Sequence, residues 1–209
     1  MQTTRRADAR RNIERILDAA VEALAEDPGA SMAAVARRAG VVRATLYVHF
    51  PTREALIGAV TERAIAETTK VIAAAQPGDG DAAHALARVL ATAWRALGRY
   101  HALVEINSRL EPGRLRALHV PVLEYLRPLL ERGRAGGAFN PDLPVDWMLT
   151  VVLELIHAAS REVTAGRLAE DDAERVLLTT VAAALRGEPA GCGAVLARGP
   201  RAPASPGSV

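Results

Sequence analysis

Apolar residues recur at helical spacing along most of this chain, beginning at residue 13. Steps of three and one place six of them on one face of an amphipathic helix: Ile13, Ile16, Leu17, Ala20, Val21 and Leu24. Residues 1–11 form a basic, polar arm before this helix, and the Asp-Pro-Gly sequence at 27–29 should end it. No segment alternates between apolar and polar residues for long enough to predict a β-strand, so the pattern favours an all-α protein.

Two short helices and a longer one are predicted next. Ser31 is a candidate N-cap for the first, and Gly40 should end it, because a left-handed backbone is common at such turns. Residues 43–49 predict the second short helix, and Thr52 is expected to cap a longer helix that runs to about Ala75. The residues expected to point inward from the first short helix are Met32, Val35, Ala36 and Ala39.

The second half of the chain also has helical periodicity, after a break at residues 76–81 (QPGDGD) that we interpret as a hinge. A turn is expected at residues 111–113, and Pro128 should kink the helix that contains it. Residues 188–209 are rich in Gly, Pro, Ala and Ser and are predicted to be a disordered tail. The predicted helices span residues 82–97, 100–110, 121–134, 144–164 and 170–186.

The most informative segment is residues 31–50, SMAAVARRAGVVRATLYVHF. Ala36 must be small if the two short helices cross closely there, Gly40 makes the turn, and Leu46 plugs the second helix into the first. Small, glycine and apolar residues at this spacing predict a helix-turn-helix. This motif presents the outer face of its second helix to the major groove of DNA.

Across residues 10–60 the sequence resembles the TetR family of transcriptional regulators. The resemblance rests on A-x-x-A-G-V at Ala36–Val41, on T-L-Y-x-H-F at Thr45–Phe50, and on a proline followed by a capped helix at Pro51–Leu56. It covers under a third of the chain, and T-L-Y-x-H-F is far more specific than a bare helix-turn-helix pattern. The chain departs from the family at Val42, where a small polar residue is usual, so one phosphate hydrogen bond and one helix cap are not expected here.

The resemblance implies an all-α fold with an N-terminal three-helix DNA-binding domain and a larger helical ligand-binding and dimerisation domain. We assign residues 1–52 to the arm and helix-turn-helix, 53–75 to a connecting helix, 76–187 to sensing and dimerisation, and 188–209 to the tail. The implied function is a ligand-responsive transcriptional regulator, a repressor that a small molecule releases from a palindromic DNA operator. A ligand-independent regulator or an activator with the same fold is the alternative.

Candidate DNA contacts lie in and around the second short helix. Arg43 is suited to a guanine edge, and the methyl groups of Ala44 and Thr45 to the methyl group of thymine. Tyr47 can place its hydroxyl on a phosphate or a base edge, and the remaining positions are expected to face the DNA backbone. The predicted DNA-binding residues are Ser31, Val42, Arg43, Ala44, Thr45, Tyr47, His49 and Arg53.

The helices at 144–164 and 170–186 are apolar over wide faces, which predicts burial on more than one side. Pattern and resemblance together favour a homodimer through a symmetric four-helix bundle, with two helices from each subunit. A pocket for an unidentified effector is expected among residues 82–157. The candidate lining residues are Trp94, Tyr100, Glu105, Asn107, His119, Tyr125, Trp147, Met148, Glu154 and His157.

Composition and motifs also limit the classes of protein to which this chain can belong. The 26 basic residues barely exceed the 24 acidic ones, so affinity for DNA must come from where the charges lie. Cys192 is the only cysteine, which excludes an internal disulfide framework and a multi-cysteine metal site. His101 and Glu105 are one helical turn apart, but we interpret them as a surface pair rather than metal ligands. No catalytic motif, cofactor site or membrane-spanning segment is found, so we expect a cytoplasmic, non-enzymatic protein.

Overall fold

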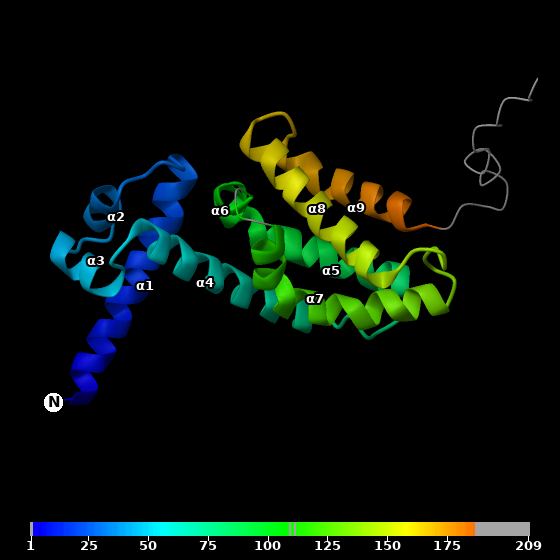
Figure 1. The fold of residues 1–209 in the computed structure, drawn as a ribbon, viewed down its shortest axis with the longest axis horizontal. Coiled ribbons are helices and arrows are strands. Elements are labelled where there is room, and N and C mark those ends of the chain that lie inside the picture. Colours follow the sequence, from blue (N-terminus) through cyan, green and yellow to red (C-terminus); the bar gives the residue numbers. More distant parts are fainter. Residues whose placement is uncertain (1, 109, 111, 187–209) are drawn as a thin grey trace, which may run out of the picture.

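The computed structural model describes residues 2–186 except 109 and 111, and the side chains of residues 9–186 except 109, 111 and 112. Every regular element in the described part of the chain is helical, as the sequence predicts (Figure 1). The predicted tail at 188–209 lies outside the described residues. The elements are α1 (Gln2–Glu26), α2 (Met32–Arg38), α3 (Arg43–His49), α4 (Arg53–Ala74), α5 (Ala82–Leu97), the 3-10 turn η1 (Gly98–Tyr100), α6 (His101–Asn107), α7 (Pro112–Ala135), α8 (Val145–Thr164) and α9 (Glu170–Leu185).

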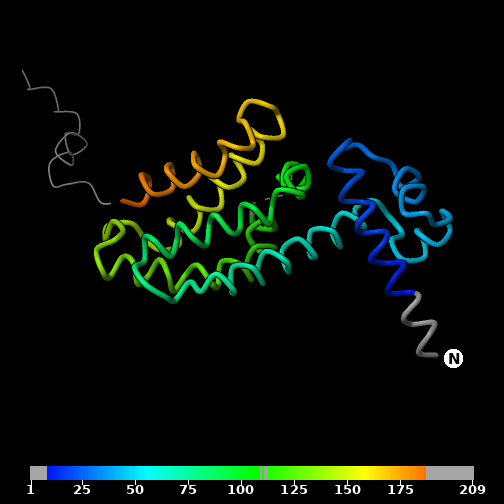
Figure 2. Tube along the Cα trace, turned by 180° about the vertical axis from the view of Figure 1, so that it is seen from behind, coloured from blue at the N-terminus to red at the C-terminus, as the bar shows by residue number. Residues whose placement is uncertain are grey.

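Two apolar clusters organise these helices. The first joins α1, α2, α3 and the first half of α4, and it includes Tyr100 and Leu103 from η1 and α6. The second joins α5, α7, α8 and α9 with Ile72 near the end of α4. Figures 1 and 2 show the result: the three N-terminal helices lie at one end, and the long α4 runs from them into the larger bundle. Because α4 contributes to both clusters, it is the mechanical link between them.

The start of the chain differs from the sequence expectation. Residues 2–11, predicted as an arm, continue the helical backbone of α1. The predicted hinge at 76–81 is held in place by two arginines. Arg88 donates hydrogen bonds to the carbonyls of residues 75, 76 and 79, and Arg132 donates to those of residues 77 and 78. The turn therefore packs on α5 and α7.

Helix α7 begins earlier than predicted. The expected turn at 111–113 is wrong, because Pro112 is the first residue of α7. Proline is favoured at this position, where its missing amide hydrogen has no helical partner to lose. The helix continues through Pro121 and Pro128 to Ala135. Burial of one leucine face offsets the two missing backbone hydrogen bonds. The buried leucines of α7 are Leu115, Leu123, Leu126, Leu129 and Leu130.

Candidate nucleic-acid interface and ligand cavity

The turn between α2 and α3 is held from both sides. Ser31 Oγ accepts a hydrogen bond from the amide of Ala34 at 3.2 Å and so caps α2, as predicted. Gly40 has a φ of +63°, and a Cβ atom there would lie 2.9 Å from Arg15 Nη2. The same Nη2 donates hydrogen bonds to the carbonyls of Ala39, at 2.6 Å, and Gly40, at 3.3 Å. Helix α1 thus clamps the turn, a contact that the sequence pattern does not indicate.

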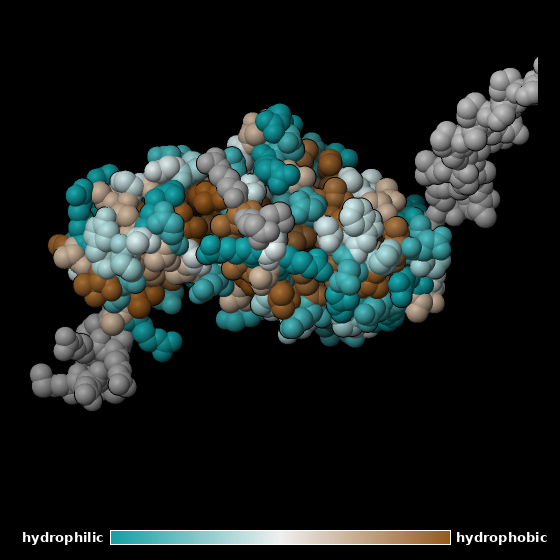
Figure 3. All heavy atoms as spheres, viewed as in Figure 1, coloured by the Kyte–Doolittle hydropathy of each residue, from teal (hydrophilic) through white to brown (hydrophobic). Residues whose placement is uncertain are grey.

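Helix α3 has one buried anchor and a broad open face. Leu46 is 0% exposed and packs into the cluster formed with α1 and α2. Tyr47, the next residue, is 48% exposed. Figure 3 shows apolar surface at the end of the molecule that carries α3. The predicted contacts that this region leaves fully or partly exposed are Val42, Arg43, Ala44, Thr45, Tyr47 and His49.

Two valines make this open face unusual. Val42 is 70% exposed and Val48 is 79% exposed, although valine is normally a buried residue. Val42 occupies the N-cap of α3 and makes no side-chain cap hydrogen bond, as its apolar side chain requires. The sequence analysis missed Val48. The sequence signal that indicates its exposure is its position between Tyr47 and His49, on a helix that Leu46 alone anchors to the core. Exposed valine methyl groups are suited to the methyl group of thymine.

Arg53 makes hydrogen bonds within the protein that the sequence did not predict. It is the first residue of α4, which Thr52 caps by accepting a hydrogen bond from the amide of Ala55 at 3.1 Å. The guanidinium of Arg53 donates to the carbonyl of Pro28 at 2.5 Å and to that of Ala30 at 3.3 Å. It therefore ties the loop before α2 to α4. Its contact with DNA stays a prediction.

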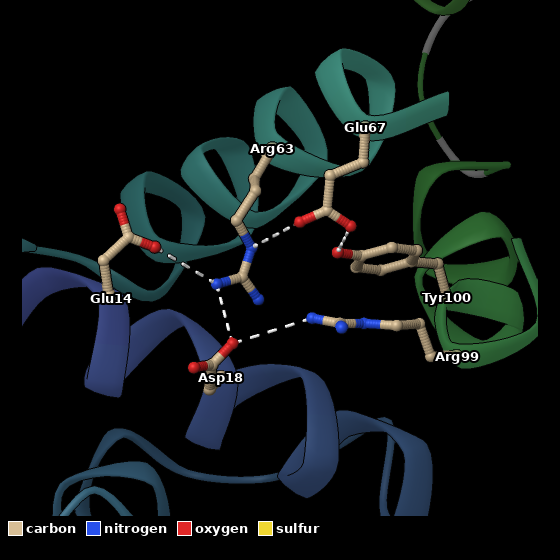
Figure 4. Close-up of polar contacts among 6 residues, drawn as sticks. All are labelled: Glu14, Asp18, Arg63, Glu67, Arg99 and Tyr100. Carbon is tan, nitrogen blue, oxygen red and sulfur yellow. Dashed lines mark hydrogen bonds and ion pairs between the residues drawn. The ribbon is translucent and has the colours of Figure 1, made fainter. Parts of the chain in front are cut away.

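A cluster of charged side chains joins α1, α4 and η1 (Figure 4). Arg63 Nη1 lies 2.9 Å from Asp18 Oδ1 and 3.7 Å from Glu14 Oε2, both on α1. Arg63 Nε lies 3.9 Å from Glu67 Oε1, one turn along α4. The Tyr100 hydroxyl donates to Glu67 Oε2 at 2.7 Å. Burial and the hydrogen bond to Glu67 raise the pKa of Tyr100, so it remains a protonated donor. The cluster connects the helix-turn-helix to the larger bundle.

A mostly apolar cavity of about 70 Å³ lies beside this cluster, among α4, α5, η1, α6, α7 and α8. Tyr100 belongs to both the cluster and the cavity wall. No acidic side chain, lysine or arginine is present among the described residues that line it. Its polar lining residues are Thr61, Thr68, Tyr100, Asn107, His119 and His157.

The two histidines of the cavity wall are paired edge to face. The ring centroids of His119 and His157 are 5.1 Å apart. His119 Nδ1 lies 2.8 Å from the carbonyl oxygen of Leu115, so this nitrogen carries the proton and donates it. Burial lowers the pKa of both histidines, and nearby His119 and Arg161 help to bring that of His157 to about 4. Both rings are therefore neutral at neutral pH.

The sequence candidates for ligand contact are divided by the structure. Tyr100, Asn107, His119 and His157 line the cavity. Trp94 and Glu154 line separate surface clefts. Four others are not part of the cavity wall: Glu105 is half-buried, Met148 is in the bundle core, and Tyr125 and Trp147 are exposed. These side chains lie on other faces of their helices, which sequence spacing alone does not reveal.

The interpretation of His101 and Glu105 as a surface pair is wrong. His101 is buried, with Nδ1 3.1 Å from Ser160 Oγ and its ring 4.7 Å from that of Trp94, because α6 packs on α8. Within the described residues no group of three or more His, Cys, Asp or Glu side chains is arranged to hold a metal ion. Nor does that part of the chain contain a helix long and apolar enough to cross a membrane.

Comparison with known families identifies the N-terminal region. Residues 16–60 match the family model of the bacterial regulatory proteins, tetR family. This match covers the second part of α1, all of α2 and α3, and the beginning of α4, and so includes the turn and the open helix face described above. No curated protein sequence matches the chain significantly.

Solved structures share the fold over nearly their whole length. The TetR-like transcriptional regulator LfrR from Mycobacterium smegmatis, in complex with proflavine, is 23% identical, with a TM-score of 0.66 over 86% of this chain and 99% of its own. FadR from Bacillus subtilis, in complex with stearoyl-CoA, is 19% identical, with a TM-score of 0.67 over 83% and 99%. PfmR from Thermus thermophilus is 24% identical, with a TM-score of 0.64 over 83% and 98%. At these identities the likeness establishes a common fold.

Proposed function

We propose that this chain, whose residues 16–60 match the tetR family model, is a TetR-family transcriptional repressor that a small molecule releases from a palindromic DNA operator. The observation that carries the proposal is the construction of α3. Leu46 anchors one side of this helix, while Tyr47 and its exposed neighbours on the other side are left without protein partners to bury them. A helix held in this way is suited to enter a major groove.

The function is tested by selecting, from the source genome, the DNA fragments that the full-length protein binds. We expect a small set of palindromic sites, with affinity that falls as salt is raised because phosphate contacts release counterions. Sites without symmetry would contradict a dimeric reader, and the absence of any preferred fragment would contradict the regulator itself. A compound titration on the recovered operator then separates release by a ligand from the alternative, a ligand-independent regulator or an activator.

Replacement of Tyr47 by alanine is expected to weaken operator binding by about 1–3 kcal/mol. The side chain is 48% exposed, so its removal should leave the thermal stability almost unchanged. Operator titrations by mobility shift and a thermal unfolding curve give the two readouts. Tyr125→Ala is the matched control, because Tyr125 is also exposed but lies on α7. Normal operator binding by the Tyr47 variant would remove this residue from the interface.

We also propose that the chain forms a homodimer through α8 and α9. Trp147, Val151 and Leu155 follow one another at steps of four along α8, and so share a face. Trp147 is 56% exposed and the two aliphatic residues are only half-buried in the single chain. On α9 the exposed small residues 182–184 allow another helix to approach closely. An exposed tryptophan on the same helix face as half-buried aliphatic residues is typical of a subunit interface.

Replacement of Trp147 by glutamate is expected to separate the subunits, because a carboxylate would have to be buried without a partner. Sedimentation analysis should give the mass of a dimer for the parent protein and that of a monomer for the variant. Tyr125→Glu, at an exposed aromatic position on α7, should leave the dimer intact. A parent protein that sediments as a monomer at operator-binding concentrations would contradict the proposal.

Release by a ligand would act through the cavity and the charged cluster that adjoins it. Tyr100 lines the cavity, its hydroxyl binds Glu67, and Glu67 neighbours Arg63, which pairs with Asp18 on α1. A ligand that prefers a different position of Tyr100 would therefore favour a different position of α1. Ligand and operator must then weaken each other's binding by the same factor. Complexes of similarly folded regulators with proflavine and stearoyl-CoA support a ligand-binding role for this bundle.

A further inference from the structure

Exposed apolar side chains gather on α3 and its N-cap. The described residues contain six large apolar side chains that are exposed, and three of them fall within residues 42–48. They are Val42, Tyr47 and Val48, which are 70%, 48% and 79% exposed. A single exposed valine is ordinary, but a group of this kind on one short segment marks an interaction surface.

The buried anchor of α3 defines which of its side chains point farthest outward. Successive residues of an α-helix are about 100° apart around the helix axis, so Ala44 and Val48 are each about 160° from Leu46, whereas Tyr47 is about 100° from it. Leu46 is 0% exposed, and Ala44 and Val48 are both exposed. The two are four residues apart and lie one above the other on the same face. Together they form the outermost part of α3.

This outermost part can make only apolar contacts, because neither side chain has a hydrogen-bond donor or acceptor. A recognition helix that enters the major groove brings such a face against the edges of the bases. The apolar group that a base presents in that groove is the C5 methyl group of thymine. Methyl groups on the helix therefore meet their chemical counterpart on one of the four bases.

The charges around this face suit DNA rather than another protein. Residues 31–50 contain no acidic residue, and Arg37 and Arg43 are exposed. Positive charge of this kind attracts the phosphates on either side of a groove. The face also lies within residues 16–60, which match the family model. We therefore take duplex DNA as its occupant.

We propose that Val48 is a specificity-determining residue that packs, together with Ala44, against the methyl group of a thymine in each operator half-site. The inference rests on the function proposed above and names the base feature that the centre of α3 reads. At this position the protein discriminates against uracil, which presents the same hydrogen-bonding groups as thymine but lacks the methyl group.

The test replaces each thymine of the recovered operator in turn with deoxyuridine, in both half-sites at once. This change removes one methyl group per half-site and leaves the pairing with adenine intact. Mobility-shift titrations with the full-length protein should show, at one thymine, a loss of affinity of about fourfold per half-site, the equivalent of one buried methyl group. Val48→Ala should bind the thymine operator more weakly and lose most of the difference between thymine and uracil at that position.

Val42→Ala is the matched control, because Val42 is also an exposed valine but precedes α3 as its N-cap. It should discriminate between thymine and uracil at that position as the parent protein does. Both variants should keep the melting temperature of the parent protein, since each shortens an exposed side chain.

Three outcomes would overturn the inference: no thymine at which loss of the methyl group weakens binding, full discrimination by Val48→Ala, or loss of the same discrimination in Val42→Ala. A palindromic operator recovered together with any of these would leave the proposed regulator standing without its methyl contact. If selection recovers no preferred fragment, the proposed function itself is contradicted, and this inference with it.

Discussion

Replacement of Leu46 by alanine is expected to destabilise the helix-turn-helix cluster by about 2–5 kcal/mol. Leu46 is 0% exposed and is the only residue of the seven in α3 that is fully buried, so its truncation leaves a cavity that few neighbours can fill. Short helices depend on tertiary packing, because seven residues are too few to be stable alone. Loss of this anchor should therefore release α3 as a whole.

Denaturant unfolding and hydrogen exchange of the α3 amides would measure this effect. Val48→Ala is the matched control: it also shortens an aliphatic side chain on α3, but at a position that is 79% exposed. Its free energy of unfolding should change by less than about 0.5 kcal/mol. Equal loss of stability in the two variants would mean that Leu46 is not the anchor. Because both residues flank Tyr47, comparing the two variants also separates the effect of packing on stability from an effect on DNA recognition.

Acidification from pH 6.5 to about 4 is expected to destabilise the folded protein by about 3 kcal/mol through His157 alone. Burial lowers the pKa of His157 from 6.5 to about 4 in the folded state. Well above pH 6.5 the ring is neutral in both states and contributes no pH dependence. Between these values the unfolded chain binds a proton that the folded protein does not bind, so the free energy of unfolding falls as the pH falls.

The measurement compares unfolding free energies of the parent protein and His157→Leu across this pH range. Groups that do not contact His157 cancel in the difference, including the buried His101, whose pKa burial also lowers. The variant should lose markedly less stability on acidification than the parent. Parallel curves for the two proteins would show that His157 does not remain neutral in the fold. The His157 ring lines the cavity, so a ring that stays neutral supplies no positive charge to the cavity wall.

The helix-turn-helix could be predicted closely because its determinants are local. Ser31 caps α2 through an amide three residues away, Gly40 takes the left-handed backbone of the turn, and Leu46 is buried as the plug. Each of these follows from spacing within about twenty residues, over which helical periodicity and capping are reliable guides. The exposed position of Tyr47 follows from the same periodicity, one residue after the buried leucine.

Contacts between distant segments were not predictable in this way. Arg15 reaches the turn at Ala39 and Gly40 from α1, and Arg53 turns back to Pro28 and Ala30, although its position at a helix start favoured an outward role. The spacing of arginines along the sequence does not show which carbonyl group each side chain will bind. The predicted turn at 111–113 failed for a related reason, because packing of the leucine face extends α7 through residues that alone favour a turn.

The sequence by itself therefore determined an all-helical chain with a helix-turn-helix near its start and an exposed, tyrosine-bearing second helix. Only the tertiary structure decided which side chains of the larger bundle meet in one cavity. Thr68, Asn107 and His157 come from three helices and meet through helix packing, while Trp147 and Tyr125 turn outward. Periodicity defines the faces of one helix, but the choice of neighbour for each face depends on how all the helices pack together.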